Sequence, residues 1–367
     1  MTNHNAQNER LKRSYMVYLK EAKRHDDSTM DGVAKAIHRF ETYTKFKDFR
    51  SFRIEQAVGF KHHVAGLANL RTGKPLSKAT LNQTFSALKN FFQWLAGRPG
   101  FRARLSYHDA DYFNLSQKET RIATAHRHGL VPTLEQIHIT LGSMPWQTDV
   151  EKRNRALIAF TILTGTRDGA TASLKLRHIF ITDGKVFQDA RDVNTKFSKT
   201  FSTWFFPVGQ KAFQIIAEWV DFLQDEKRWG IEDPLFPATK VIIGSNQTFE
   251  AAGLDRRHWT NAGPIRSVFK AAFISAGLPS FNPHSFRKTL VRLGQEICKT
   301  PEEFKAWSQN LGHEEVLTTF RNYGNIEAGR QATIIKSLGR QGPESIRRSE
   351  LPKLIEDFLA HQKKNAS

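Results

Sequence analysis

The chain has 367 residues, which exceeds the size at which one hydrophobic core usually stops growing, so two domains are expected. Apolar residues make up 39% and aromatic residues 11% of the sequence, and this composition excludes a disordered chain. Lys and Arg number 55 against 36 Asp and Glu, which gives a net charge of +19 at pH 7. Such a charge repels itself unless a polyanion neutralises it, so nucleic acid is the first expected partner.

The sequence has a single cysteine, Cys298, and its polar N-terminus has no apolar segment of signal-peptide length. One cysteine can form neither an internal disulfide nor a cysteine-type zinc site, which is typical of a protein from a reducing compartment. No run of ~18 apolar residues predicts a membrane span. The 14 His residues are scattered, so no metal site is expected.

The first hundred residues have the apolar spacing of amphipathic helices, with steps of three and four residues. Four such segments begin near Leu11, Ser28, Arg53 and Ser77, and the third is expected to end near Leu70. Ser28 to Asp31 has the pattern of a capping box at the start of the second segment. The last segment is the clearest and ends at Ala96, before Gly97 and Pro99. These segments predict a small helical bundle whose apolar faces form a core.

Basic residues concentrate between positions 51 and 130, which hold twelve Lys or Arg and four Asp or Glu. A charge run is often only a solvated surface, but this one surrounds the expected bundle and continues into the polar segment 116–129. We interpret that segment as an interdomain linker. A basic bundle followed by a basic linker suits a protein that closes around a phosphate backbone and releases its counterions.

The residues after 130 predict a mainly helical domain with one small antiparallel sheet. Runs of β-branched and aromatic residues predict its strands at 177–181, 185–190 and 204–206, with Asp183-Gly184 as a hairpin turn. Helical spacing surrounds this region. The helices are expected at Thr133 to Gly142, at Ala156 to Thr164 with a short extension to Leu174, at Phe213 to Leu223, and after Pro264, Pro283 and Thr300.

Four short motifs follow one another in this second part of the chain. They are Thr164-Gly165-Thr166-Arg167, His284-x-x-Arg287, Leu311-Gly312-His313, and Thr318-Thr319 followed by Tyr323. Alone, each has an ordinary explanation, such as a helix cap or a half-buried aromatic residue. In this order they resemble the boxes of the tyrosine recombinase (phage integrase) family, over about residues 130 to 335. The helical region 10–100 resembles the core-binding (SAM-like) domain of that family only in length, charge and helix content.

The resemblance implies DNA strand cleavage through a 3′-phosphotyrosine intermediate, with Tyr323 as the nucleophile. Arg167 and Arg287 would hold the nonbridging phosphate oxygens, since guanidinium groups offer paired donors that stay charged. His284 is the implied acid-base partner of the tyrosine, and His313 the implied donor to the phosphoryl oxygens. No cofactor and no metal are implied.

A lysine of the small sheet protonates the leaving 5′ oxygen in this family, and both Lys196 and Lys199 are candidates. The family's usual spacing of about eight residues to the following proline favours Lys199, because Pro207 lies eight residues after it. Lys196 remains the alternative.

Two features depart from the family pattern. An acidic residue usually stands three positions after the first arginine, where this chain has Ala170. The interval from His313 to Tyr323 is ten residues rather than the usual nine. The orienting acid is therefore undecided, and its candidate substitutes are Asp168, Asp183, Asp189 and Asp192.

The resemblance implies a helical DNA core-binding domain at residues 1–115, a linker at 116–130 and a catalytic domain at 131–340. A tail at 341–367 carries an apolar stripe at helical spacing, formed by Leu351, Leu354, Ile355, Phe358 and Leu359. A helix of about ten residues is not stable alone, so this stripe requires a docking groove. The groove would lie either on its own domain or on a neighbouring protomer.

The expected function is site-specific recombination of double-stranded DNA by a homo-tetramer, for integration or excision of a mobile element. A resolvase or invertase would use the same chemistry, and a monomeric type IB topoisomerase would share it. A catalytically weak DNA-binding regulator of the same fold is the alternative from another class. An accessory DNA-bending or directionality protein is a further partner that the resemblance allows. The expected location is the cytoplasm of a prokaryote, in association with the nucleoid.

Overall fold

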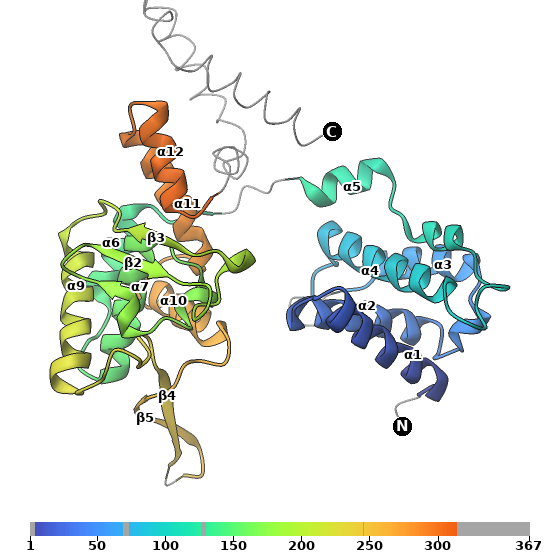
Figure 1. Ribbon diagram of the computed structural model, residues 1–367, viewed down its shortest axis with the longest axis horizontal. Coiled ribbons are helices and arrows are strands. Elements are labelled where there is room, and N and C mark those ends of the chain that lie inside the picture. Colours follow the sequence, from blue (N-terminus) through green and yellow to red (C-terminus); the bar gives the residue numbers. More distant parts are fainter. Residues whose placement is uncertain (1–3, 69–72, 126–129, 245, 314–367) are drawn as a thin grey trace, which may run out of the picture. The chain divides into compact units, whose positions relative to one another are not determined.

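The computed structural model describes residues 4–68, 73–125, 130–244 and 246–313 (Figure 1). The chain divides into two compact units, Met1–His126 and Arg127–Ser367. Each unit has its own hydrophobic core. The protein is mainly helical with small antiparallel sheets, as the sequence predicts.

The first unit is a helical bundle around a cluster of phenylalanines. Its helices are α1 (Ala6–Val17), α2 (Asp27–Tyr43), α3 (Ile54–Ala65), α4 (Lys78–Ala96) and α5 (Gln117–Thr124). The Phe40 ring lies edge-on to those of Phe60, Phe92 and Phe113, with centroids 5.2, 5.3 and 5.6 Å apart. Edge-to-face packing adds stability beyond the apolar area that is buried. The predicted apolar stripes therefore form the core of this unit.

Two boundaries in the first unit differ from the sequence prediction. Asp26, not Ser28, caps α2, because its carboxylate accepts a hydrogen bond from the Thr29 backbone N–H at 2.7 Å. Helix α3 ends at Ala65 rather than near Leu70. Helix α5 lies inside the segment that we interpreted as a linker, and Ser116 and Glu119 form its capping box.

The second unit is built around α7 (Asp149–Thr164), whose residues from Ala156 to Thr164 are all buried. Helix α7 packs against α9 (Gln210–Asp221) and α11 (Pro283–Ile297). A helix that is apolar on all sides needs neighbours on all sides, and the surrounding elements supply them. The other helices of the unit are α6 (Leu134–Ser143), α8 (Asp168–Thr171), α10 (Gly263–Ser275) and α12 (Pro301–Asn310).

The predicted antiparallel sheet is present, with strand order β1-β2-β3, but β1 is shorter than predicted and β3 begins and ends earlier. Strand β1 spans only Ile179–Phe180, β2 spans Lys185–Gln188, and β3 spans Phe201–Trp204 instead of 204–206. Phe206 leaves the sheet because its N–H bonds to the Leu163 carbonyl at 2.7 Å and its ring is buried. The end of β3 is thus determined by contact with α7.

A second antiparallel hairpin, β4 (Ala238–Ile243) and β5 (Phe249–Asp255), projects from the second unit (Figure 1). This hairpin was not predicted, although Val241, Ile242 and Ile243 are β-branched and Gly244 follows them. Arg153 of α7 is buried and bonds to the Pro237 carbonyl and the Thr239 hydroxyl, both at 2.9 Å. These bonds fix the base of the hairpin.

Candidate active site

Arg287 is the centre of the candidate site. Pro283 begins α11, and Asn282 caps it by accepting the Ser285 backbone N–H at 3.0 Å, so Arg287 lies in its first two turns. The Arg287 side chain is only 5% exposed. Its guanidinium donates hydrogen bonds to the carbonyls of Gly165 and Leu311, the latter at 2.6 Å, and lies 3.0 Å from His313 Nε2. One side chain therefore joins three of the four motifs.

The two glycines of these motifs permit this close approach. Gly165 ends α7 with φ of +59°, and a Cβ there would lie 2.7 Å from Leu311 Cδ2 and 2.9 Å from Leu290 Cδ1. Gly312 has φ of +69°, and a Cβ there would lie 2.6 Å from the Phe201 ring. Both positions combine a left-handed backbone with contact distances that exclude a side chain. The end of α7 can thus pack directly against the residues that follow α12.

Arg167 supplies the second positive charge of the site. It lies at the N-cap position of α8 and is half-buried, and burial lowers the pKa of its guanidinium. Within the described ranges, no hydrogen bond or ion pair of this guanidinium is found. Burial, followed by repulsion from Arg167, lowers the pKa of Arg287 to about 9. A buried cation and a half-buried cation that repel each other form a site that an anion would stabilise.

The positive charges of Arg287 and Arg167 act on both histidines of the motifs. Burial is the largest cause that lowers the pKa of His313 to about 4, and the charges of Arg287 and Arg167 come next. His284 stays exposed, yet desolvation by the protein atoms around its ring and the charge of Arg287 lower its pKa as well. Both imidazoles are therefore neutral near pH 7, and a bound anion would raise the pKa of each.

The two candidate lysines lie in the loop between β2 and β3. Phe197, in this loop, has φ of +62° and an exposed ring, and both ammonium groups lie over that ring, at 4.7 Å for Lys196 and 5.9 Å for Lys199. Lys199 is among the largest charges that lower the pKa of His313, and Lys196 is not among them. Of the two lysines, Lys199 therefore has the stronger electrostatic effect on His313.

The four carboxylates that could replace the missing acid have different surroundings. Asp168 accepts a hydrogen bond from Arg266 Nε at 2.6 Å, and its charge acts to raise the pKa of His284. The other three pair with basic residues of the sheet region: Asp183 with Lys185, Asp189 with Arg191, and Asp192 with Arg177. Ala170 itself is buried. Arg266, which was not predicted from the sequence, thus orients Asp168, the carboxylate that acts on His284.

Tyr323, Thr318, Thr319 and the tail at 341–367 lie outside the described residues. Within the described ranges, no group of three or more His, Cys, Asp or Glu is arranged to hold a metal ion. The helices of those ranges include none with the length and apolar character needed to cross a membrane.

A search of protein-family models found no match to this chain. The tyrosine recombinase XerC of Halalkalibacterium halodurans is 21% identical over 314 residues, which cover 85% of this chain and 92% of that protein. A lambda integrase solved as a tetramer bound to a Holliday junction superimposes with a TM-score of 0.58 at 14% identity, covering 88% of this chain and 78% of that chain. The Tn1549 transposon integrase, solved with transposon right-end DNA, gives 0.54 at 13% identity, with coverages of 90% and 99%.

The helical bundle and the helical unit with its small sheet are the fold of these two-domain DNA enzymes. The sequence similarity extends over most of the chain, and the four motifs occur in the family's order. The chain is similar to tyrosine recombinases in fold and, at 21% identity, in sequence.

Proposed function

We propose that this chain is a site-specific DNA recombinase that cleaves and rejoins strands through a covalent link between Tyr323 and a 3′ phosphate. The observation that carries the proposal is the convergence on Arg287 of the Gly165 carbonyl, the Leu311 carbonyl and His313. Residues up to 148 positions apart in the chain, from Gly165 to His313, thereby surround one cationic site. Among the residues that the structure describes, no carboxylate bonds to either arginine.

In the proposed reaction a phosphodiester lies between Arg167 and Arg287. Attack by the Tyr323 oxygen forms the new P–O bond and breaks the bond to the 5′ oxygen. Charge builds on the nonbridging oxygens, and fixed donors that need no rearrangement stabilise it. The energy of the broken bond is retained in the phosphotyrosine, so rejoining needs no ATP.

Two proton transfers complete the step. The phenol has an ordinary pKa of ~10 and needs a base, for which neutral His284 is suited. Lys199 delivers a proton to the leaving 5′ oxygen, and its electrostatic influence on His313 supports it over Lys196. His313 donates a hydrogen bond to a nonbridging oxygen. Asp168, which Arg266 holds in place, orients His284. It thereby takes the role of the acidic residue that the family usually has at the position of Ala170.

We further propose that the first unit binds DNA as a core-binding domain, in keeping with its excess of basic residues. The likeness to a lambda integrase tetramer supports action as a homo-tetramer. The likeness to a transposon integrase supports integration or excision of a mobile element. The C-terminal tail would dock on its own domain or on a neighbouring protomer in that assembly.

The test is capture of the covalent intermediate. The full chain is incubated with nicked duplex DNA from its own genomic junction, and the product is separated on a denaturing gel. We expect a protein–DNA adduct that Tyr323→Phe abolishes while changing DNA affinity by no more than a few-fold, because only the nucleophilic hydroxyl is lost. An adduct that persists in Tyr323→Phe would refute the assignment of the nucleophile. Binding of the junction without any adduct in the unchanged chain would favour a regulator.

A further inference from the structure

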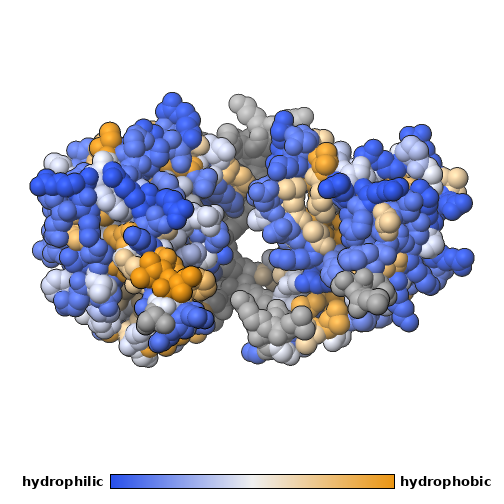
Figure 2. Space-filling view, turned by 90° about the horizontal axis from the view of Figure 1, so that it is seen from below, coloured by the Kyte–Doolittle hydropathy of each residue, from blue (hydrophilic) through white to orange (hydrophobic). Residues whose placement is uncertain are grey.

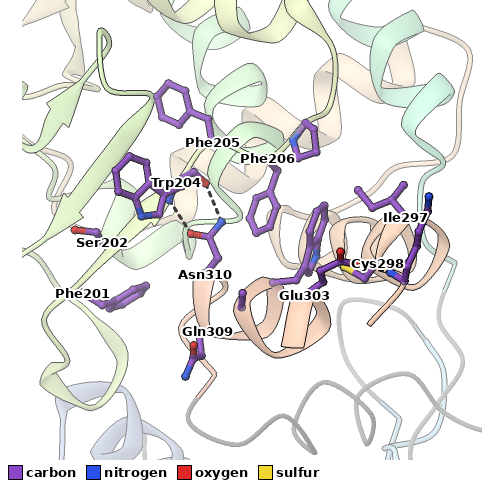
Figure 3. A pocket seen from close by; sticks show the side chains of 14 residues that line it. Phe201, Ser202, Trp204, Phe205, Phe206, Ile297, Cys298, Glu303, Gln309 and Asn310 are labelled. Carbon is purple, nitrogen blue, oxygen red and sulfur yellow. Dashed lines mark hydrogen bonds between the residues drawn. The ribbon is translucent and has the colours of Figure 1, made fainter. Parts of the chain in front are cut away.

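A pocket of about 910 Å³ lies between β3 and α12 of the second unit (Figure 3). We call it the β3–α12 pocket. Its walls are largely apolar, and two of its side chains, Trp204 and Ile297, are 54% and 43% exposed. Cys298, the single cysteine of the sequence, also lines it. Its main apolar lining residues are Phe201, Trp204, Phe206, Ile297 and Trp307.

The walls of this pocket are held in place by hydrogen bonds. The Asn310 side chain accepts the Trp204 backbone N–H at 2.7 Å and donates to the Trp204 carbonyl at 2.9 Å (Figure 3). The Trp307 indole donates to the Leu290 carbonyl at 2.9 Å, and its ring lies 4.6 Å from that of Phe206. A pocket whose walls are already ordered binds a partner at a lower entropic cost.

The β4–β5 hairpin has an apolar face without a partner among the described residues. The pairs Ile243↔Phe249 and Val241↔Ala251 place these side chains on one face, because every second residue of a strand faces the same side. Val241, Ile243 and Phe249 are 54%, 70% and 82% exposed. Figure 2, seen from the side on which the hairpin projects, shows an apolar patch on this unit. A contiguous exposed apolar patch marks an interaction surface.

The hairpin projects from the end of the second unit that lies away from α12, and residues of β3 and α12 line the pocket (Figure 1). The hairpin therefore does not enter the pocket of its own copy. A projection at one end and a hollow at the other produce a head-to-tail contact between copies, which closes into a ring when the rotation allows. We propose that the β4–β5 hairpin of one copy inserts Ile243 and Phe249 into the β3–α12 pocket of a second copy of this chain.

The charged residues near the two surfaces do not select the contact. Glu250 pairs with Ile242, on the face of the hairpin opposite Ile243 and Phe249, and the pocket lining contains Glu303 as well as Lys299. The contact would therefore depend on burial of apolar side chains.

The apolar area of the hairpin face indicates under which conditions two copies would form this contact. Its exposed side chains offer on the order of 400 Å², against ~800 Å² per partner in a stable interface. The hairpin alone would therefore not hold two copies together in dilute solution. The contact requires copies tethered on one DNA, and in this respect it rests on the proposed function. Because Asn310 of the pocket wall precedes Leu311 and His313, the contact would also steady the candidate site of the receiving copy.

Cross-linking between two populations of full-length chain tests the proposal. One population carries Asn246→Cys at the hairpin tip together with Cys298→Ser, and the other keeps Cys298 and carries a size tag. Both carry Tyr323→Phe, so that no covalent DNA adduct forms. They are mixed on linear plasmid DNA and treated with a short bismaleimide. We expect a cross-linked species of mixed size on a denaturing gel, because the tip lies in the pocket of the neighbouring copy.

Two matched controls define the result. Moving the introduced cysteine to exposed Asp221 at the end of α9 should abolish the mixed species. Adding Phe249→Ser to the hairpin population should lower the yield of the mixed species roughly tenfold. The reason is that removal of one aromatic anchor commonly weakens the affinity of an interface by at least that factor. Phe249 is 82% exposed, so the variant should fold, and an unchanged thermal midpoint checks this.

Three outcomes would overturn the proposal. One is absence of the mixed species on DNA, and another is a mixed species that Phe249→Ser leaves unchanged. The third is a Cys298 that reacts with maleimide only after residues 348–367 are deleted, which would assign the pocket to the chain's own tail. The assay needs no strand cleavage. If the mixed species forms but the unchanged chain gives no covalent adduct, the hairpin contact is supported and the recombinase proposal is refuted. If the unchanged chain gives the adduct but no mixed species forms, the recombinase proposal is supported and the hairpin contact is refuted.

Discussion

Replacement of Arg287 by methionine separates the proposed catalytic role of this residue from its part in folding. Methionine has a similar length and no charge, so Arg287→Met removes the guanidinium and keeps most of the packing. In the folded protein, burial and Arg167 lower the pKa of Arg287 from 12.5 to about 9. At 1.36 kcal/mol per pKa unit, holding this charge costs the folded state roughly 5 kcal/mol.

The lost hydrogen bonds act in the opposite direction. The substitution leaves the Gly165 and Leu311 carbonyls without their donor, at a cost of about 1–3 kcal/mol each. The two effects nearly cancel, so the free energy of unfolding should fall by no more than about 2 kcal/mol. Covalent adduct formation should fall roughly a hundredfold or more, because a donor to the transition-state oxygens is lost.

The measurements are chemical denaturation and the rate of adduct formation on nicked DNA, with Trp219→Phe as the matched control. Trp219 is buried in the same unit and donates to the Leu235 carbonyl at 2.9 Å. Its substitution should cost stability and leave the rate per folded molecule unchanged. A loss of stability in Arg287→Met far above the expected value, or a rate near that of the unchanged chain, would show that Arg287 is structural.

Three further predictions concern other parts of the candidate site. Lys199→Ala should block cleavage of ordinary DNA and be rescued by a 5′-bridging phosphorothiolate, because sulfur leaves without a proton, whereas Lys196→Ala should cleave normally; rescue in Lys196→Ala instead would reverse the assignment. The folded-state pKa of His313 is about 4, below its unfolded value of ~6.5. The unfolded chain therefore binds more protons between these values, so the free energy of unfolding should decrease as the pH falls through this window, by up to roughly 3 kcal/mol from this group. His313→Gln should flatten that decrease in denaturation curves at several pH values, and an unaltered slope would contradict the lowered pKa. Gly165→Ala should lower both stability and adduct formation, because its Cβ would lie 2.7 Å from Leu311 in a left-handed backbone, and a thermal midpoint equal to that of the unchanged chain would show that the contact can relax.

Local sequence signals predicted much of the secondary structure. The apolar steps from Leu81 to Leu95 and the Ser77 cap specify α4, and Thr133 with Gln136 and Thr300 with Glu303 form capping boxes at α6 and α12. Caps and apolar periodicity act within a few residues, so the chain needs no distant partner to encode them. The hairpin β4–β5 lacked such support, because a short β-branched run is ambiguous without knowledge of its neighbours.

The sequence by itself determined which residue types the candidate site contains and in what order, since Arg167, His284, Arg287 and His313 lie in three of the four motifs. Only the tertiary structure decided what those residues contact. The partners of Arg287 are the backbone carbonyls of Gly165 and Leu311, and every residue has a carbonyl, so no sequence pattern marks them. The choice of Asp168 over Asp183, Asp189 and Asp192 likewise depends on which basic groups each carboxylate meets after folding. Electrostatic energy depends on distance and burial in space, and both arise when segments far apart in the chain pack together.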